Sequence, residues 1–127
     1  MFNLNSKIIL ITGGAGLLGS RLVKVIHSHE GIPIVLDNDI KKINELKKKF
    51  KNKHNSISFY KVDITNKNQV KKVINKIYKK FKKIDCLINN AGFNPKMGSK
   101  NNRLETFSLD QWNKEIQIGL TGALIMS

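Results

Sequence analysis

Short apolar runs alternate with amphipathic segments along the whole chain. Four runs rich in β-branched residues have the length of buried strands, and they cover residues 8–11, 32–36, 57–62 and 84–88. After each run, apolar residues recur at spacings of three and four, which predicts helices ending near residues 29, 50, 81 and 126. The pattern therefore predicts consecutive strand–helix units, with no linker and no internal repeat between them.

That order of elements limits the fold. Strands joined by crossover helices pair in parallel with right-handed crossovers, and repeated units build a sheet covered by helices on both faces. We therefore expect an α/β fold, a Rossmann-type doubly wound parallel sheet with three layers (α/β/α), truncated after the fourth strand and its following helix. The ligand site of such a sheet lies at the carboxyl ends of the strands. The loops that reach this edge begin at Gly13, Asp37, Asp63 and Asn89.

Polar residues mark the helix starts and the connecting loops. Thr65 or Asn66 is placed to cap the third helix, and residues 108–111 have the pattern of a capping box for the fourth. Polar loops are expected at residues 52–56 and 93–107, and the length of the second suggests function or mobility. The fourth helix is apolar on most sides from residue 120 to residue 126. We expect that end to be covered by the rest of a domain or by a partner.

The turn after the first strand is rich in glycine. Gly14-Ala15-Gly16-Leu17-Leu18-Gly19 fits the pattern Gly-x-Gly-x-x-Gly between a strand and a helix, the context in which that pattern indicates dinucleotide binding. A Cβ there would obstruct the tight turn, the approach of the backbone to a pyrophosphate, or the contact of the helix with the strand. The N–H groups at the helix start would face the phosphates. The alternative is a glycine-rich turn that binds nothing.

Carboxylates follow the second and third predicted strands. Asp37 lies about 20 residues beyond the glycine turn, where a carboxylate accepts hydrogen bonds from an adenosine ribose. The alternative is a turn-forming aspartate within Asp37-Asn38-Asp39. For Asp63 two roles stay open: an acceptor for the adenine amino group, or the start of the turn before the third helix.

The net charge of +14, from 23 Lys and Arg against 9 Asp and Glu, raises the question of nucleic-acid binding. The composition argues against specific binding. Arginine supplies the forked contacts that recognise bases and phosphates, and the chain has arginine at positions 21 and 103 alone. The lysines are spread over the predicted helix faces. We therefore expect no specific nucleic-acid partner.

The remaining chemistry-bearing residues suggest no metal centre. Cys86 is the single cysteine and lies in an apolar run, so we expect a small core residue. His27 and His29 lie on different sides of a helix, and His54 has no nearby ligand partner, so no zinc site is expected. No apolar run approaches the length of about 20 residues that a membrane span needs. We expect a cytoplasmic protein with no membrane partner.

Four motifs occur along the chain in a characteristic order and spacing: residues 12–19, Asp37, Val62-Asp63-Ile64 and, most specific, Asn89-Asn90-Ala91-Gly92. Together they resemble the short-chain dehydrogenase/reductase family, over essentially the whole chain and corresponding to the N-terminal half of a member. The resemblance implies that Asp37 holds the adenosine ribose, that Asp63 and Ile64 hold the adenine, and that the last motif lines the nicotinamide-side ribose and stabilises the sheet. The cofactor-binding residues would be Thr12, Gly13, Gly14, Gly16, Leu17, Leu18, Gly19, Asp37, Asn38, Asp63, Ile64, Asn89, Ala91 and Gly92.

Three features depart from the pattern of the family. Glycine spacing at 13, 16 and 19 follows the extended branch, which acts on nucleotide sugars, whereas the Asn-Asn-Ala-Gly motif follows the compact branch. Gly119 stands where the compact branch carries a catalytic asparagine, at a helix distortion that glycine itself permits. The catalytic serine and the Tyr-x-x-x-Lys motif of the family lie beyond residue 127. Tyr78 precedes any family-like position for that motif, and Tyr60 lies in a predicted strand.

We therefore interpret residues 1–127 as the N-terminal part of an NAD(P)-binding domain. The resemblance implies an oxidoreductase that transfers hydride between a nicotinamide cofactor and an alcohol or carbonyl substrate, a small molecule such as a sugar-pathway compound. The alternatives are an extended-branch nucleotide-sugar epimerase or dehydratase, and a non-catalytic module that senses a dinucleotide. NAD is expected rather than NADP, with a homo-oligomer as the full-length protein. Alone, this chain is expected to turn over no substrate and to be poorly soluble.

Overall fold

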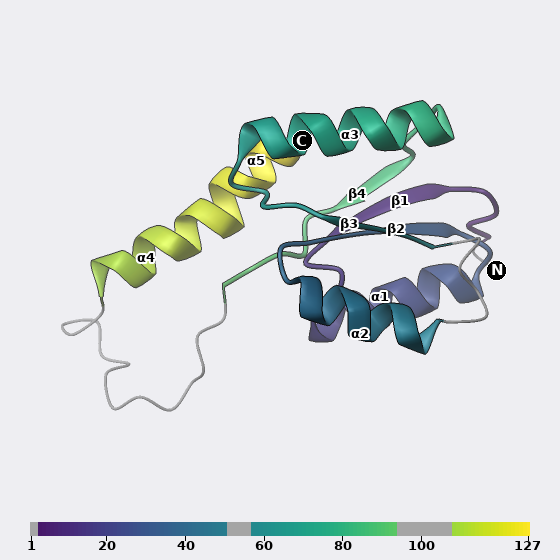
Figure 1. Cartoon of the computed structure of the whole chain (residues 1–127), viewed down its shortest axis with the longest axis horizontal. Helices are drawn as coiled ribbons and strands as arrows, with labels where there is room; N and C mark the ends of the chain where they lie inside the picture. The colour runs from purple at the N-terminus through teal and green to yellow at the C-terminus, as the bar shows by residue number, and fades with distance from the viewer. Residues whose placement is uncertain (1–2, 51–56, 94–107) are drawn as a thin grey trace.

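The computed structural model describes residues 3–50, 57–93 and 108–127. The chain runs through β1 (Ile8–Thr12), α1 (Leu17–Ser28), β2 (Ile32–Asp37), α2 (Ile40–Lys49), β3 (Ser58–Lys61), α3 (Lys67–Phe81), β4 (Cys86–Ile88), α4 (Leu109–Ile116), the π-helical turn η3 (Gln117–Gly122) and α5 (Ala123–Met126) (Figure 1). The predicted alternation of strand and helix is confirmed. The third and fourth strands are shorter than expected. The predicted loop at 52–56 and all but the first residue of that at 93–107 lie outside the described residues.

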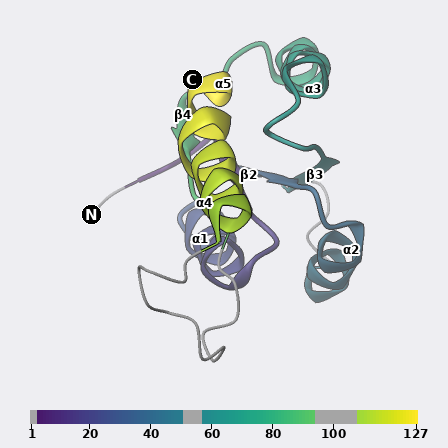
Figure 2. The same ribbon diagram turned by 90° about the vertical axis from the view of Figure 1, so that its left-hand side faces the viewer.

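The four strands form one parallel sheet in the order β3-β2-β1-β4. Figures 1 and 2 show α1 and α2 on one face of the sheet, with α3 and α5 on the other. This arrangement confirms the doubly wound α/β/α fold expected from the sequence. From β1 the chain builds the sheet outwards in one direction through β2 and β3, and then returns to add β4 on the other side of β1. The strand order therefore reverses between β1 and β4, and sheets of this kind bind ligands at such a point.

Alternate residues of the central strands form two cores. On one face, Leu10 and Ile34 pack in a cluster with Ile77 of α3 and with Met126. On the other face, residues from β1 and β2 cluster with residues from α1 and α2, namely Ile9, Ile11, Val35, Val23, Ile26 and Leu46. The continuous apolar run of β1 thus has both of its faces buried, as a central parallel strand requires.

Two expectations about buried residues are wrong. Cys86, expected in the core, is exposed, because it is the first residue of the edge strand β4. Met126 lies at the apolar end of the last helix, which was expected to need a cover from outside these residues; it is already buried among residues of the sheet and α3. Leu120 and Leu124, at 65% and 75% exposed, do present the apolar surface that was expected near the end of the chain. Whether that surface causes association stays a prediction.

The helix caps follow the predicted chemistry with one difference. Asn66, rather than Thr65, caps α3 by accepting from the N–H groups of Asn68 and Gln69. Ser108 caps α4 through the N–H of Gln111. The side chain of Gln111 donates instead to Glu115, one turn further along the helix. The cap of α4 is therefore a single serine contact, because the glutamine finds a carboxylate partner at i+4.

Asp85 joins the starts of the two strands that flank the reversal point. Its carboxylate accepts from the N–H of Ile8 at 2.8 Å and pairs with Lys83 at 3.0 Å and Lys7 at 3.5 Å. The Ile8 N–H, followed by the Lys83 side chain, holds the pKa of Asp85 below its ordinary value. A carboxyl whose pKa is lower in the folded state stabilises the fold above its unfolded pKa, and that contribution is lost as the pH falls through the folded pKa.

We predict that Asp85→Asn lowers the melting temperature at pH 7, because the variant removes the charge that holds two lysines while keeping an oxygen for Ile8. The difference from the unaltered chain should begin to shrink as the pH falls below about 4, the ordinary aspartate pKa, and should disappear below the lowered pKa of folded Asp85, where the wild-type carboxyl is neutral as well. Thermal unfolding followed by circular dichroism at pH 7 and pH 3 measures both values. A difference that is equal at the two pH values would contradict the prediction.

Candidate functional site

The described residues line an open cavity of about 750 Å³ at the carboxyl edge of the sheet. All four loops that leave this edge contribute to it, and so do α2, α4 and η3. Most residues predicted to bind cofactor line it, namely Gly13, Gly16, Leu17, Leu18, Gly19, Asp37, Asn38, Asp63, Ile64, Ala91 and Gly92. Thr12, Gly14 and Asn89, which were also predicted, are outside the lining. The fold therefore brings together predicted residues that lie as far apart in the sequence as Gly13 and Gly92.

The glycine turn forms one wall and is shaped by two close contacts. Gly13 has a φ of 61°, in the left-handed region that favours glycine, and a Cβ there would lie 2.9 Å from the Cα of Ala91. A Cβ at Gly19 would overlap the carbonyl oxygen of Gly13. These contacts allow the first turn of α1 to lie against the ends of β1 and β4. The predicted reason for glycine at the helix–strand contact is confirmed at Gly19.

Gly16 presents bare backbone to the cavity. It is the N-cap residue of α1 and makes no side-chain cap contact. Its own N–H donates to Gly13, and the N–H of Ser20 donates back to Gly16, as in a regular helix start. The first N–H groups of any α-helix lack partners within the helix. At this end of α1 they border a cavity in which an anion is favoured by the helix dipole.

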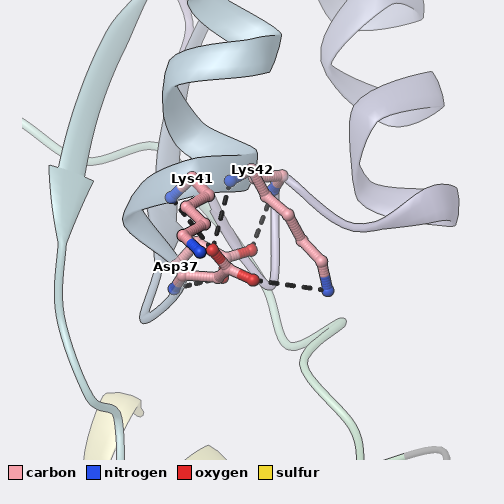
Figure 3. A network of polar contacts seen from close by, with 5 residues as sticks. Asp37, Lys41 and Lys42 are labelled. Atoms are coloured by element: carbon pink, nitrogen blue, oxygen red, sulfur yellow. Dashed lines mark hydrogen bonds and ion pairs between the residues drawn. The ribbon is translucent and has the colours of Figure 1, made fainter.

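Asp37 lies at the end of β2 and ties that strand to the glycine turn. One carboxylate oxygen accepts from the N–H of Ala15, and the other accepts from the N–H of Asp39, each at 3.0 Å. The side chain is buried, with 8% of the residue exposed, and it still lines the cavity. Figure 3 shows the polar network that includes Asp37, in which Lys41 and Lys42 make their contacts with Asp39. The turn-forming role is therefore observed, and the carboxylate also borders the cavity.

Asp63 likewise has a local role that sequence reasoning left open. Its carboxylate accepts from both the N–H and the hydroxyl of Thr65, at 2.9 Å and 2.7 Å. The turn before α3 is thus held by Asp63. Asp63 and the next residue, Ile64, both line the cavity, so the structural role leaves room for contact with a ligand.

Thr12 and Asn90 clamp the glycine turn to the loop after β4. The Thr12 hydroxyl accepts from the N–H groups of Asn90 and Ala91, both at 3.0 Å, and donates to the carbonyl of Ile88. The side-chain amide of Asn90 donates to the carbonyls of Thr12 and Gly13, at 3.0 and 3.2 Å. Thr12 is 1% exposed. It therefore acts beneath the cavity rather than in its wall.

Within the Asn-Asn-Ala-Gly motif, the two asparagines have different surroundings. Asn90 lines the cavity, although it was not among the predicted residues, whereas Asn89 is exposed and its amide faces the hydroxyl of Ser127 at 3.4 Å. The four consecutive residues 90–93 all line the cavity, so alternation of side chains along a strand does not separate Asn90 from Asn89. The contacts of the Asn90 amide with the carbonyls of Thr12 and Gly13 hold it there, and no sequence pattern indicates them.

The second wall contains residues that the sequence analysis missed. Lys114, Gln117 and Ile118, from α4 and η3, line the cavity together with Phe93. The ammonium of Lys114 lies 5.8 Å from the centre of the Phe93 ring. Because a long polar segment separates β4 from α4 in the sequence, no periodicity could have placed this helix beside the glycine turn. Other unpredicted lining residues are Leu36, Lys42, Val62 and Thr65.

Two positions bear on acid–base chemistry. Gly119 lies inside the π-helical turn η3, so the predicted helix distortion is confirmed there, without a side chain. Tyr78 and Lys82 have the spacing of a Tyr-x-x-x-Lys motif, but they belong to α3 and its C-cap and are not among the residues that line the cavity. Among the described residues, no group of His, Cys, Asp and Glu could hold a metal ion.

Comparison with known proteins relates this chain to short-chain dehydrogenases and other oxidoreductases. The family model for short chain dehydrogenases matches residues 7–127. An uncharacterized oxidoreductase of Staphylococcus saprophyticus is 34% identical over 98% of this chain and 48% of its own length. An NAD-dependent glycerol dehydrogenase of Listeria innocua is 27% identical over 99% of this chain and 46% of its own.

A solved structure agrees with this result. A short chain dehydrogenase from Bacillus anthracis superposes with a TM-score of 0.84 at 28% identity, covering 94% of this chain and 48% of that one. The chain thus spans about half the length of the relatives that it matches. With the family model covering nearly every residue, and with the glycine turn and the Asn-Asn-Ala-Gly loop meeting at one cavity, the chain belongs to the short-chain dehydrogenase family.

Proposed function

We propose that this chain supplies the cofactor site of an oxidoreductase that transfers hydride between NAD and an alcohol or carbonyl compound. The observation that carries the proposal is that the glycine turn, Asp37, Asp63 and the Asn-Asn-Ala-Gly loop converge on the same cavity. The bound nicotinamide would supply the hydride chemistry. The residues of this chain would hold the cofactor and orient it.

The cavity fits a dinucleotide in size and in the distribution of its polar groups. Its volume of about 750 Å³ is within the range of small-molecule sites. The start of α1, with Gly13 and Gly16, would hold the pyrophosphate. Asp37 and Asn38 would hold the adenosine ribose, and Asp63 with Ile64 the adenine. The remaining assignments are Leu17, Leu18 and Gly19 near the pyrophosphate, and Ala91 and Gly92 at the nicotinamide-side ribose.

The structure modifies the proposed roles of three predicted residues. Thr12 is beneath the glycine turn, so we infer a supporting role in place of direct contact. Gly14 donates its N–H to Leu36 and belongs to the same support. Asn90, rather than Asn89, faces the cavity, and we propose Asn90 as the asparagine that contacts or positions the cofactor.

Transfer of hydride to a carbonyl carbon also requires an acid for the oxygen. The family resemblance assigns that role to a serine and a Tyr-x-x-x-Lys motif beyond residue 127, and Gly119 offers no side chain for a proton relay. We propose a small-molecule substrate, a homo-oligomeric parent protein and a cytoplasmic location. Among the described residues, no helix has both the length and the apolar character needed to cross a membrane.

We predict that NAD binds more tightly than NADP. A 2′-phosphate would lie beside Asp37, and two unit charges about 4 Å apart repel by about 4 kcal/mol at an effective dielectric constant of about 20. Solvent reduces this value considerably. Calorimetric titration of the 127-residue chain with both cofactors at low salt measures the preference. Equal or tighter binding of NADP would refute this prediction.

We predict that Gly16→Val abolishes dinucleotide binding and leaves the fold largely intact. Gly16 has a φ of −72°, which any residue adopts, and a Cβ there meets the carbonyl of Gly13 at 3.1 Å as its nearest neighbour. The rest of the valine would project into the space proposed for the pyrophosphate. Titration with NAD tests binding, and circular dichroism tests the fold. Unchanged affinity would mean that the turn is structural alone.

We predict that Thr12→Val lowers both stability and NAD affinity, whereas Thr12→Ser retains most of each. Valine has nearly the shape of threonine but leaves the N–H groups of Asn90 and Ala91 without their acceptor. An unsatisfied buried donor costs about 1–3 kcal/mol. Urea unfolding gives the free energy of unfolding for both variants. Equal stability of the two variants would show that the hydroxyl is dispensable.

A further inference from the structure

We propose that Gly122 is a positioning residue of the cofactor site, because its lack of a side chain keeps the wall at the proposed adenine end of the cavity in its open shape. The residue that it positions is Ile64, whose side chain lies against Gly122 and lines the cavity. Gly122 itself is not among the residues that line it. This inference rests on the proposed function, since it concerns the base end of the same dinucleotide site.

Space, rather than backbone conformation, demands glycine at position 122. Gly122 has a φ of −61° and a ψ of −41°, which are ordinary helical values. A Cβ there would lie 2.7 Å from Cδ1 and 2.9 Å from Cγ1 of Ile64, both closer than favourable carbon–carbon contacts. The next neighbour, the carbonyl oxygen of Gln117, would be 3.4 Å away. Alanine at this position would therefore act on Ile64.

The turn that carries Ile64 is held by hydrogen bonds, so its side chain would take up the displacement. The N–H of Asp63 donates to the side chain of Gln69, and the N–H of Thr65 donates to the carboxylate of Asp63. The carbonyl of Asp63 accepts from the N–H of Asn66, the N-cap residue of α3. These contacts lie on both sides of residue 64 and oppose a retreat of its backbone. Cδ1, by contrast, is the free end of a side chain that can change rotamer.

The surroundings of Ile64 direct that displacement toward the cavity. Ile64 is 7% exposed and belongs to the core cluster that includes Val70 of α3 and Met126 of α5. Protein cores are close-packed and resist the insertion of further atoms. The cavity is the open space that Ile64 borders. A methyl group at position 122 would therefore push the Ile64 side chain into the volume proposed for the adenine.

The test compares Gly122→Ala with Gly119→Ala as the matched control, which makes the same substitution in the same π-helical turn. A Cβ at Gly119 would meet no atom within 4 Å, and the φ of Gly119 is not in the left-handed region. Kd values for NAD, and for ADP as its competitor, are measured by calorimetry on the 127-residue chain. ADP carries the adenine but no nicotinamide. We expect Gly122→Ala to weaken both ligands by about three- to tenfold, and Gly119→Ala to change either by less than about twofold.

Removing the atom that the new methyl group meets first should restore binding. Valine lacks Cδ1, so in the Ile64→Val background we expect Gly122→Ala to weaken NAD by less than about twofold, whatever the effect of Ile64→Val alone. A double-mutant cycle over the four chains measures this coupling. The NMR signal of the Ile64 Cδ1 methyl group reports on the side chain without any ligand. It should shift in Gly122→Ala and stay in place in Gly119→Ala.

Several results would overturn the inference: equal effects of the two alanine variants, weaker NAD binding with unchanged ADP binding, or an effect of Gly122→Ala that persists in the Ile64→Val background. Failure of Gly122→Ala to fold, as judged by circular dichroism, would also overturn it, because the core rather than the cavity would then have taken up the methyl group. Absence of NAD binding in the unaltered chain would instead overturn the proposed function, so the two failures are distinguishable.

Discussion

The structure depends on the close approach of α1 to the carboxyl ends of β1 and β4. A Cβ at Gly19 would overlap the carbonyl of Gly13, and a Cβ at Gly13 would press on Ala91, so the approach requires glycine at both positions. The approach also places the end of β1, the glycine turn and the loop after β4 close together. Their N–H and carbonyl groups must find partners, because a buried unpaired group costs free energy. Thr12 and Asn90 supply those partners.

The residues that complete this junction also form the cavity, so stability and binding share the same groups. Asp37 illustrates the consequence. Its carboxylate holds the N–H of Ala15 in the glycine turn and the N–H of Asp39 at the start of α2, while one side of it borders the cavity. A carboxylate has about four acceptor sites, and two backbone contacts leave some of them for a ligand. Asp63 combines a turn and a cavity wall in the same way, through Thr65.

The sequence was sufficient to predict the elements and the binding edge, because period and turn chemistry are local properties. It did not predict features that depend on which elements pack against each other in the fold. Cys86 is in an apolar run, yet its exposure follows from the place of β4 at the sheet edge. Met126 is buried because α5 returns to the sheet beside α3. Lys114 reaches the cavity from a helix whose position no periodicity encodes. Asn90 is held at the cavity by its contacts with the glycine turn, which likewise depend on the fold rather than on local sequence.

In the π-helical turn η3, too, residues that pack the fold together lie at the cavity. A side chain at Gly119 would meet no atom within 4 Å, so packing does not require glycine there. Gly122 differs, because a Cβ at that position would lie 2.7 Å from the side chain of Ile64, in the cavity wall. The tight contact between the last helix and the proposed adenine end is therefore made at Gly122. At position 119 the backbone is π-helical and the space beside it is open. The described residues would therefore accommodate a side chain at this position, and steric crowding does not explain the glycine.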